Sequence, residues 1–384
     1  MDLSTHWMGL PMASPLVVGA GPLCDNLEAL ELCVRGGAGA VVMRSLFEEQ
    51  VTAEHRALHR WFESPETGGE DHFVPLTEVL EAGTAPYLRQ LARLRSALGV
   101  PVIASLNGTT PGGWLDMARA LEDGGASALE LNLYEVPTLV ASAGTDIEAR
   151  QLAVVESVTS AVHVPVAVKI SPCYRSLPAS AAALARAGAA SVVLFNRFYQ
   201  PDVDLESLDV SSQVRLSTSG ELPMRLHALA ILSGRCSLEL VATGGVHTGD
   251  DVVKAVLCGA HAVQVVSALL RHGPHRLAAL RDELAARLRQ LGYPCIAEAR
   301  GVLSLERRAE PGGVGARAVH AAARWVAGTT ERRCPSGAAA ARVDVTSSTR
   351  RRPAPAGAGR RGTATAWNGV VRAARRPTGG TNGG

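Results

Sequence analysis

Residues 238–268 read LELVATGGVHTGDDVVKAVLCGAHAVQVVSA, two short apolar runs separated by one amphipathic segment. Apolar runs of this length are typical of buried parallel strands. Val252 and Val256 lie about one helical turn apart in the segment between the runs, which is typical of a helix. Gly259 then supplies the left-handed conformation that ends many helices. The stretch therefore predicts a strand–helix–strand unit.

The same pattern recurs along the preceding chain. Further apolar runs occupy residues 16–18, 40–43, 102–104, 129–132, 166–169 and 192–195. A Gly-Ala step precedes every second run, at Gly37-Ala38, Gly125-Ala126, Gly188-Ala189 and Gly259-Ala260. Eight strands alternating with helices over about 250 residues is the size of a TIM (β/α)₈ barrel, which we predict here. A doubly wound open sheet is the alternative, but it does not predict a step that recurs before every second strand.

Two segments lie outside the repeating pattern. Residues 48–86 are too long for an ordinary connection, and they follow the second strand at the end where barrel active sites lie, so we expect an inserted loop or lid. Residues 306–384 contain fifteen arginines and four acidic residues, with Ala, Gly and Pro and little hydrophobic periodicity. This composition predicts disorder. We therefore expect one barrel domain, 1–305, and a disordered tail, 306–384.

Composition excludes several classes of function. There is no uncharged apolar run long enough for a membrane span and no signal-peptide pattern, so we expect no membrane partner and a cytoplasmic protein. The seven cysteines form no CxxC pair, which argues against structural zinc and a disulfide framework. His55 and His59 have a metal-ligand spacing but no third ligand, so we expect no metal. The arginine-rich tail has no interleaved aromatic residues, so we expect no nucleic-acid partner.

Barrel active sites form at the carboxyl ends of the strands, and the candidate residues follow from that rule. The residues that end the predicted strands are Ala20, Gly21, Asn107, Asn132, Lys169, Asn196, Gly244, Gly245, Ser267 and Ala268. The glycine pair and the following helix start suit a phosphate. Asn132 and Asn196 can orient a flat heterocycle. Lys169 is one of two lysines in the chain and ends an apolar strand, so it must be ion-paired or functional.

These strand ends resemble those of class 1 dihydroorotate dehydrogenases in sequence and order. The runs that carry the resemblance are Gly19-Ala20-Gly21, Glu130-Leu131-Asn132-Leu133, Val166-Ala167-Val168-Lys169, Phe195-Asn196, Ala242-Thr243-Gly244-Gly245-Val246 and Val265-Val266-Ser267-Ala268-Leu269-Leu270-Arg271-His272-Gly273-Pro274. Residues 45–50 and 196–201 are most similar to the bacterial dihydroorotate dehydrogenase-like branch. The resemblance implies FMN, with its phosphate on Gly244, Gly245, Ser267 and Ala268 and a further contact near Ser217. It also implies Lys169 at the N1–C2 edge of the flavin, and pyrimidine biosynthesis as the setting.

The sequence departs from this family on the substrate side. The family follows the fourth-strand Asn-Leu with Ser-Cys-Pro-Asn, whose cysteine is the base, whereas this chain has Tyr134-Glu135-Val136-Pro137. Arg44 stands where the family has lysine. We therefore predict Lys169, Glu135 and Tyr134 as catalytic residues and Arg44 and Ser217 as further flavin contacts. The electron acceptor stays open, and a homodimer is one candidate assembly.

Three functions remain in view. The first is an FMN-dependent oxidoreductase that acts on dihydroorotate or a related reduced heterocycle, a small molecule. The second is a flavin-free, phosphate-binding lyase or isomerase with Lys169 as a Schiff-base residue. The third is a non-catalytic product of a frameshifted gene. The family resemblance ends near Leu305, and reading the next codons one nucleotide later can give the Asn-Pro turn and Trp-Glu-Arg helix start of the branch. A natural basic tail is the alternative.

Overall fold

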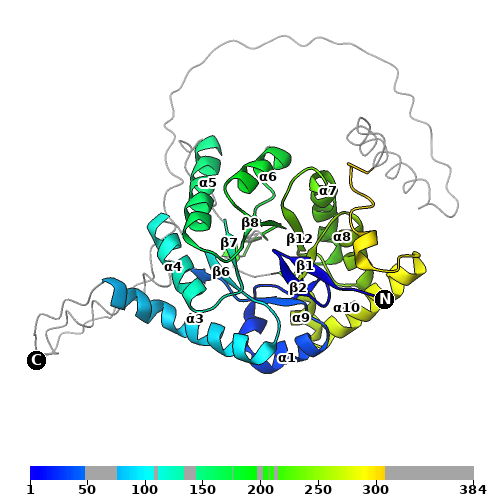
Figure 1. The fold of residues 1–384 in the computed structure, drawn as a ribbon, viewed down its shortest axis with the longest axis horizontal. Coiled ribbons are helices and arrows are strands. Elements are labelled where there is room, and N and C mark those ends of the chain that lie inside the picture. Colours follow the sequence, from blue (N-terminus) through cyan, green and yellow to red (C-terminus); the bar gives the residue numbers. More distant parts are fainter. Residues whose placement is uncertain are drawn as a thin grey trace, which may run out of the picture. The chain divides into compact units, whose positions relative to one another are not determined.

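The computed structural model describes residues 1–47, 76–107, 111–133, 144–174, 176–196, 202–206, 208–211 and 215–307 (Figure 1). All of these residues belong to one unit of the chain, Met1–Arg317. The predicted tail lies outside the described residues from residue 308 onward, so its predicted disorder and its reading frame stay predictions.

Eight parallel strands form a closed ring at the centre of the molecule (Figure 1). In order around the ring they are β3 (Leu16–Val18), β4 (Ala40–Val42), β6 (Val102–Asn107), β7 (Ala128–Asn132), β8 (Val166–Ile170), β9 (Ser191–Leu194), β12 (Glu239–Thr243) and β13 (Ala262–Val265). Pairing of β4 with β6 and of β13 with β3 closes the ring. The predicted TIM barrel is confirmed, and the open sheet is excluded because an open sheet has two unpaired edges.

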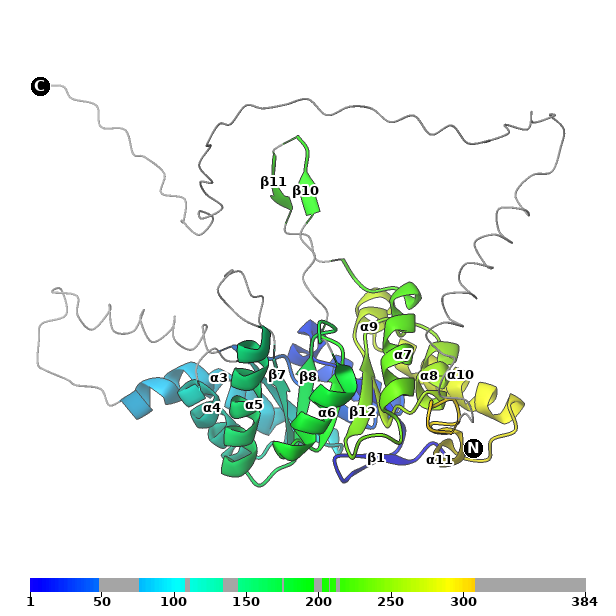
Figure 2. The ribbon, with the colours of Figure 1, turned by 90° about the horizontal axis from the view of Figure 1, so that it is seen from above.

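Helices follow the strands and cover the outside of the ring (Figures 1 and 2). They are α1 (Leu27–Arg35), α3 (Leu76–Leu98), α4 (Pro111–Asp123), α5 (Gly144–Ala161), α6 (Leu177–Arg186), α7 (Leu222–Leu232), α8 (Gly249–Leu257), α9 (Ser267–His272), α10 (Arg276–Gln290) and α11 (Ile296–Ala299). Two 3-10 turns, Pro22–Asp25 and Ser219–Glu221, precede α1 and α7. The strand–helix alternation expected from the apolar runs is therefore present.

Each Gly-Ala step forms the turn predicted from the sequence. Gly37, Gly125, Gly188 and Gly259 have φ values of 101°, 88°, 88° and 116°, in the left-handed region that favours glycine. At Gly188 a Cβ atom would lie 2.7 Å from Thr159 Oγ1, so the close approach of α5 adds a second reason for glycine. These turns end a helix and lead the chain directly into the next strand.

The interior of the barrel is filled from its amino-terminal end by a hairpin that sequence reasoning did not predict. Strands β1 (Thr5–Trp7) and β2 (Leu10–Met12) pair antiparallel. Trp7, Met8 and Met12 are buried and pack against a layer of interior residues, Val17, Ala40, Val42, Ile103, Ala128, Ala167, Val193, Val241 and Ala262. The Trp7 indole also donates a hydrogen bond of 2.8 Å to Ser191 Oγ. The hairpin therefore forms the lower part of the core.

The segment after the second strand differs in its boundary from the expected insertion. A short strand, β5 (Leu46–Phe47), pairs with β6. Helix α3 begins at Leu76 and runs through Pro86, so residues 76–86 belong to a barrel helix. Residues 48–75, which make up most of the expected insertion, lie outside the described residues. A proline inside a helix costs about 3 kcal/mol, and burial of Leu91, Leu94 and Leu98 on the same helix offsets that cost.

A second hairpin lies between β9 and α7 in the chain. It consists of β10 (Asp202–Asp204) and β11 (Asp209–Ser211), which pair antiparallel with Val203 opposite Val210. Val203, Leu205 and Leu208 in this hairpin are exposed.

Among the described helices, none is long and apolar enough to cross a membrane.

Candidate functional site

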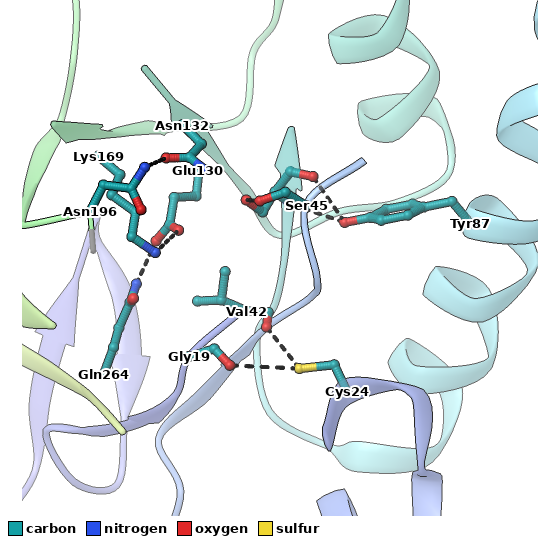
Figure 3. Close-up of polar contacts among 11 residues, drawn as sticks. Gly19, Cys24, Val42, Ser45, Tyr87, Glu130, Asn132, Lys169, Asn196 and Gln264 are labelled. Carbon is teal, nitrogen blue, oxygen red and sulfur yellow. Dashed lines mark hydrogen bonds and ion pairs between the residues drawn. The ribbon is translucent and has the colours of Figure 1, made fainter. Parts of the chain in front are cut away.

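A buried ion pair lies inside the barrel near the carboxyl ends of the strands (Figure 3). Glu130 on β7, Lys169 on β8 and Gln264 on β13 each lie two residues beyond an interior alanine, so the period of two directs them into the barrel. Lys169 Nζ lies 3.3 Å from Glu130 Oε1. Gln264 Nε2 donates a hydrogen bond to Glu130 Oε2. Since β7 and β13 are not neighbours in the ring, the contact between Gln264 and Glu130 crosses the interior.

The prediction for Lys169 left a structural ion pair and a functional role open, and the structure provides the pair. Glu130 is fully buried and the Lys169 side chain is 11% exposed, so the ammonium lies between the carboxylate and the open end of the barrel. An ammonium has three donors. Gln264 Oε1 is buried and accepts no hydrogen bond from the described residues, which leaves an acceptor for a ligand or water at this level of the barrel.

The two predicted asparagines lie together above this pair. Asn196 Nδ2 donates a hydrogen bond of 2.9 Å to Asn132 Oδ1 (Figure 3). Asn132 ends β7 opposite Lys169 on β8, so the three side chains come from adjacent strand ends. The bond fixes both amide orientations and leaves the Asn132 NH₂ group and the Asn196 carbonyl as a donor and an acceptor. Such a pair suits one edge of a flat heterocycle.

Beside them, the partly buried side chain of Tyr87 on α3 contacts β6. The Tyr87 hydroxyl accepts a hydrogen bond of 3.0 Å from Ser105 N and donates one of 3.2 Å to Ser105 O. Burial raises the pKa of Tyr87, so the phenol stays neutral. Ser105 Oγ lies 2.7 Å from Ser45 Oγ, which links the ends of β4 and β6. Asn107, a predicted contact, is buried at the end of the same strand.

The glycines after β3 have a packing role in this structure. A Cβ atom on Gly19 would lie 2.7 Å from Val266 Cγ2, and one on Gly21 would lie 3.0 Å from Val266 Cγ1. A side chain at Gly19 would therefore clash with Val266 and one at Gly21 would crowd it, and Ala20 between them is partly exposed. The thiol of Cys24 donates to Val42 O at 3.0 Å. Burial raises the pKa of that thiol to about 11, so it is an unreactive core group.

The predicted phosphate residues converge at the ends of β12 and β13. Gly244 and Gly245 have φ values of 83° and 80°. Gly245 N donates a 3.2 Å hydrogen bond to Ser217 Oγ, and Ser217 N donates one of 3.1 Å to Ser267 Oγ. Ser267 and Ala268 form the first turn of α9. The hydroxyls of Ser217 and Ser267 and the N–H groups at the start of α9 therefore lie close together, and these groups can donate to an anion.

The side chains of Arg225 and His247 contact the residues of this phosphate loop. Arg225 on α7 is buried and donates to Thr243 O at 3.1 Å and to Glu221 O at 2.7 Å, which holds the chain just before the glycine pair. His247 Nε2 lies 3.3 Å from Ser217 Oγ. Burial, aided by the nearby Arg271 charge, lowers the pKa of His247, so its ring is neutral near pH 7.

Arg44, which the resemblance makes a candidate flavin contact, follows β4 in the chain. Its side chain is 63% exposed, and Nη1 lies 3.5 Å from Asp25 Oδ2. Tyr134 and Glu135, the predicted acid–base candidates, lie outside the described residues, so their roles stay predictions. The described residues contain no group of three or more side chains that could hold a metal ion.

Comparison with known proteins identifies the chain. The family model described as "Dihydroorotate dehydrogenase" matches residues 2–288. The chain belongs to the dihydroorotate dehydrogenase family.

Two members of the dihydroorotate dehydrogenase family are 32% and 26% identical to this chain. A candidate dihydroorotate dehydrogenase A (fumarate) of Aeropyrum pernix is 32% identical over 284 residues, which are 72% of this chain and 89% of that protein. The catalytic subunit of dihydroorotate dehydrogenase B (NAD(+)) of Endomicrobium trichonymphae is 26% identical over 313 residues, 80% of this chain and 99% of that protein. Their names differ in the electron acceptor, so family membership leaves the acceptor open.

Sequence reasoning missed several residues that lie around the predicted site residues: Glu130, Gln264, Arg225 and Tyr87. Glu130 and Gln264 are polar residues within apolar strands, a signal that they face something other than the hydrophobic core. Their meeting across the barrel depends on register that only the closed ring supplies. Arg225 and Tyr87 lie on helices far along the chain from Gly244 and Ser105, and the sequence carries no local signal for these contacts.

Proposed function

We propose that the protein is an FMN-dependent oxidoreductase that oxidises dihydroorotate, or a closely related reduced heterocycle. The observation that carries the proposal is the presence of two separate binding clusters at one end of the barrel. One is the ring cluster, Asn132, Lys169 and Asn196, and the other is the phosphate cluster, Ser217, Gly244, Gly245, Ser267 and Ala268. Family membership supports the same reaction.

The chemistry of both clusters fits FMN. The phosphate cluster offers the Ser217 and Ser267 hydroxyls and the N–H groups at the start of α9, beside two glycines with positive φ, and such donors bind phosphate. The ring cluster offers a cation, an amide donor and an amide acceptor from adjacent strand ends, which match the alternating acceptors and donors along the polar edge of a flavin. Arg44 is a further candidate contact at the rim.

Bound FMN supplies an acceptor for the hydride that leaves C6 of the substrate. Lys169 holds a positive charge at the ring cluster, and that charge favours the negative charge that reduction adds. Asn132 and Asn196 orient the flat ring through their remaining amide groups. The proton that leaves C5 needs a base, and we assign that role to Glu135, which occupies the place of the family's cysteine, or to its neighbour Tyr134.

The ion pair argues against a flavin-free lyase that uses Lys169 as a Schiff-base residue. A Schiff-base lysine needs an amine that is free to attack the substrate, whereas Lys169 Nζ is engaged in an ion pair with the buried Glu130 carboxylate at 3.3 Å. The phosphate cluster alone would suit such an enzyme, but the charged lysine suits a flavin better.

The test is anaerobic reduction of FMN-loaded protein by dihydroorotate, followed as the loss of oxidised-flavin absorption. We expect stoichiometric FMN binding and bleaching that is saturable in dihydroorotate. Ser267→Asp is the control, because a carboxylate in the phosphate cluster repels the cofactor phosphate. Protein that binds no FMN would refute the cofactor, and FMN-loaded protein that dihydroorotate does not bleach would refute the substrate.

A further inference from the structure

The buried carboxylate of Glu130 has no part in the reaction described above, and its position calls for an explanation. Glu130 is fully buried in the barrel, where an unpaired carboxylate is costly. Replacement of a buried ion pair by apolar residues is often neutral or stabilising. Stability alone therefore gives a weak reason for a glutamate at this position.

Both carboxylate oxygens of Glu130 have partners from different strands. Oε1 lies 3.3 Å from Lys169 Nζ, and Oε2 accepts a hydrogen bond from Gln264 Nε2. Gln264 is itself 1% exposed and reaches across from the opposite side of the ring. The carboxylate is thus held from two sides in a close-packed interior and has little freedom to move relative to Lys169 (Figure 3).

The Lys169 ammonium and the Glu130 carboxylate lie at different depths in the barrel. Asn132, two residues beyond Glu130 on the same strand, lies opposite Lys169 and belongs to the ring cluster. Glu130 therefore lies one layer deeper in the barrel, beneath the ammonium. A ligand on the ring cluster meets the lysine first and the carboxylate second, in an interior where charges are weakly screened.

We propose that Glu130, held by Gln264, is a positioning residue that fixes the Lys169 ammonium and sets the reduction potential of the bound flavin. This inference rests on the proposed FMN function. The carboxylate partly cancels the lysine charge at the ring cluster. Reduced, anionic flavin is therefore stabilised less than it would be by an unpaired lysine, and the cofactor passes its electrons on more readily to the acceptor.

The test compares the midpoint potential of bound FMN in variants that remove one or both charges. Glu130→Gln removes the negative charge and should raise the potential. Lys169→Met removes the positive charge and should lower it. The double variant removes both and should lie between the single variants, near wild type. Each single change should alter the ratio of the dissociation constants of oxidised and reduced FMN by roughly ten- to a hundredfold, which is about 30 to 60 mV for a two-electron couple.

Two controls separate this role from a structural one. Glu130→Asp keeps the charge and should restore most of the wild-type potential. Glu239→Gln makes the same chemical change at the amino-terminal end of β12, beside the β1–β2 hairpin, and should leave the potential unchanged. A merely structural Glu130 would weaken the binding of oxidised and reduced FMN equally and leave the potential where it is.

The outcomes discriminate between the proposals. Wild-type protein that binds no FMN overturns the proposed function and this inference with it. Wild-type protein that binds FMN, with equal potentials in Glu130→Gln and wild type, overturns only the inference. If Glu130→Gln does not fold, the double variant replaces it, and a potential no higher than that of Lys169→Met refutes the role. Loss of FMN from Glu130→Gln, Lys169→Met and the double variant also refutes it, because the ion pair would then be needed to bind FMN and not to set its reduction potential.

Discussion

The stability of the protein should fall in mild acid because of one histidine at the sealed end of the barrel. The His261 ring stacks on His6, with the centroids 6.1 Å apart, and Nδ1 accepts a 3.1 Å hydrogen bond from Leu240 N. Burial lowers the pKa of His261 from 6.5 to about 4, and the charges of Arg300 and His6 add to this effect. Glu239, the nearby carboxylate, pairs with His6 instead.

The sign and size of the effect follow from proton linkage. Between pH 6.5 and pH 4 the unfolded chain protonates this histidine and the folded chain does not, so stability falls as the pH falls. A shift of this size corresponds to roughly 3 kcal/mol of unfolding free energy, lost progressively below pH 6.5 and complete near pH 4. No change is expected from this group above pH 7.

The variant His261→Asn isolates the contribution of this histidine. Its Oδ1 can take the place of Nδ1 as the acceptor for Leu240 N, but it has no proton to bind in this range. Urea unfolding at several pH values should show a pH slope between 6.5 and 4 that is clearly shallower in the variant than in wild type. His227→Gln, a change at an exposed histidine, is the matched control and should keep the wild-type slope. Equal slopes for His261→Asn and wild type would refute the reasoning.

Three further predictions concern the site. Ser267→Asp should abolish FMN binding by charge repulsion while the neutral isostere Ser267→Asn retains most of it, as measured by flavin fluorescence; equal retention would remove the phosphate from this position. Lys169→Ala should slow flavin reduction by about 10²-fold, the scale of losing one electrostatic stabiliser, and an unchanged rate in stopped flow would rule out the role. Tyr87→Phe should lower the free energy of unfolding by about 1–3 kcal/mol, because Ser105 N and O lose a buried partner; unfolding at the wild-type denaturant concentration would contradict this.

Sequence reasoning could name the residues at the strand ends, because the rule it used is local. A strand end is visible in the sequence where an apolar run stops, and parallel strands in a ring bring all such ends to one face. Asn132, Lys169 and Asn196, read separately from three runs, lie together in the structure. Ser217 joined the phosphate cluster through family resemblance alone, and its contacts with Gly245 and Ser267 agree with that placement.

The sequence predicted less wherever a contact depends on distant partners. Glu130 was recognised as part of a strand but not as the partner of Lys169, because the pairing requires the register of β7 against β8. Pro86 was taken as the end of the insertion, yet α3 runs through it, since packing of the later turns outweighs the local cost.

Gly245 is a poor position at which to test the phosphate site by substitution. A Cβ there would lie 2.6 Å from Leu222 N, so a substitution at Gly245 would disturb the backbone as well as the cofactor.

The β1–β2 hairpin lets the stability of the protein be changed separately from its turnover. It seals the barrel at the end away from the candidate site, with Trp7 fastened to Ser191 at the start of β9. Substitutions in the hairpin change the packing at the amino-terminal end of the barrel and therefore the folding equilibrium. The candidate site lies at the other end of the strands, so these substitutions do not contact it. Protein engineering could therefore raise heat tolerance by repacking Met8 and Met12, while the turnover of the enzyme is left to the opposite end.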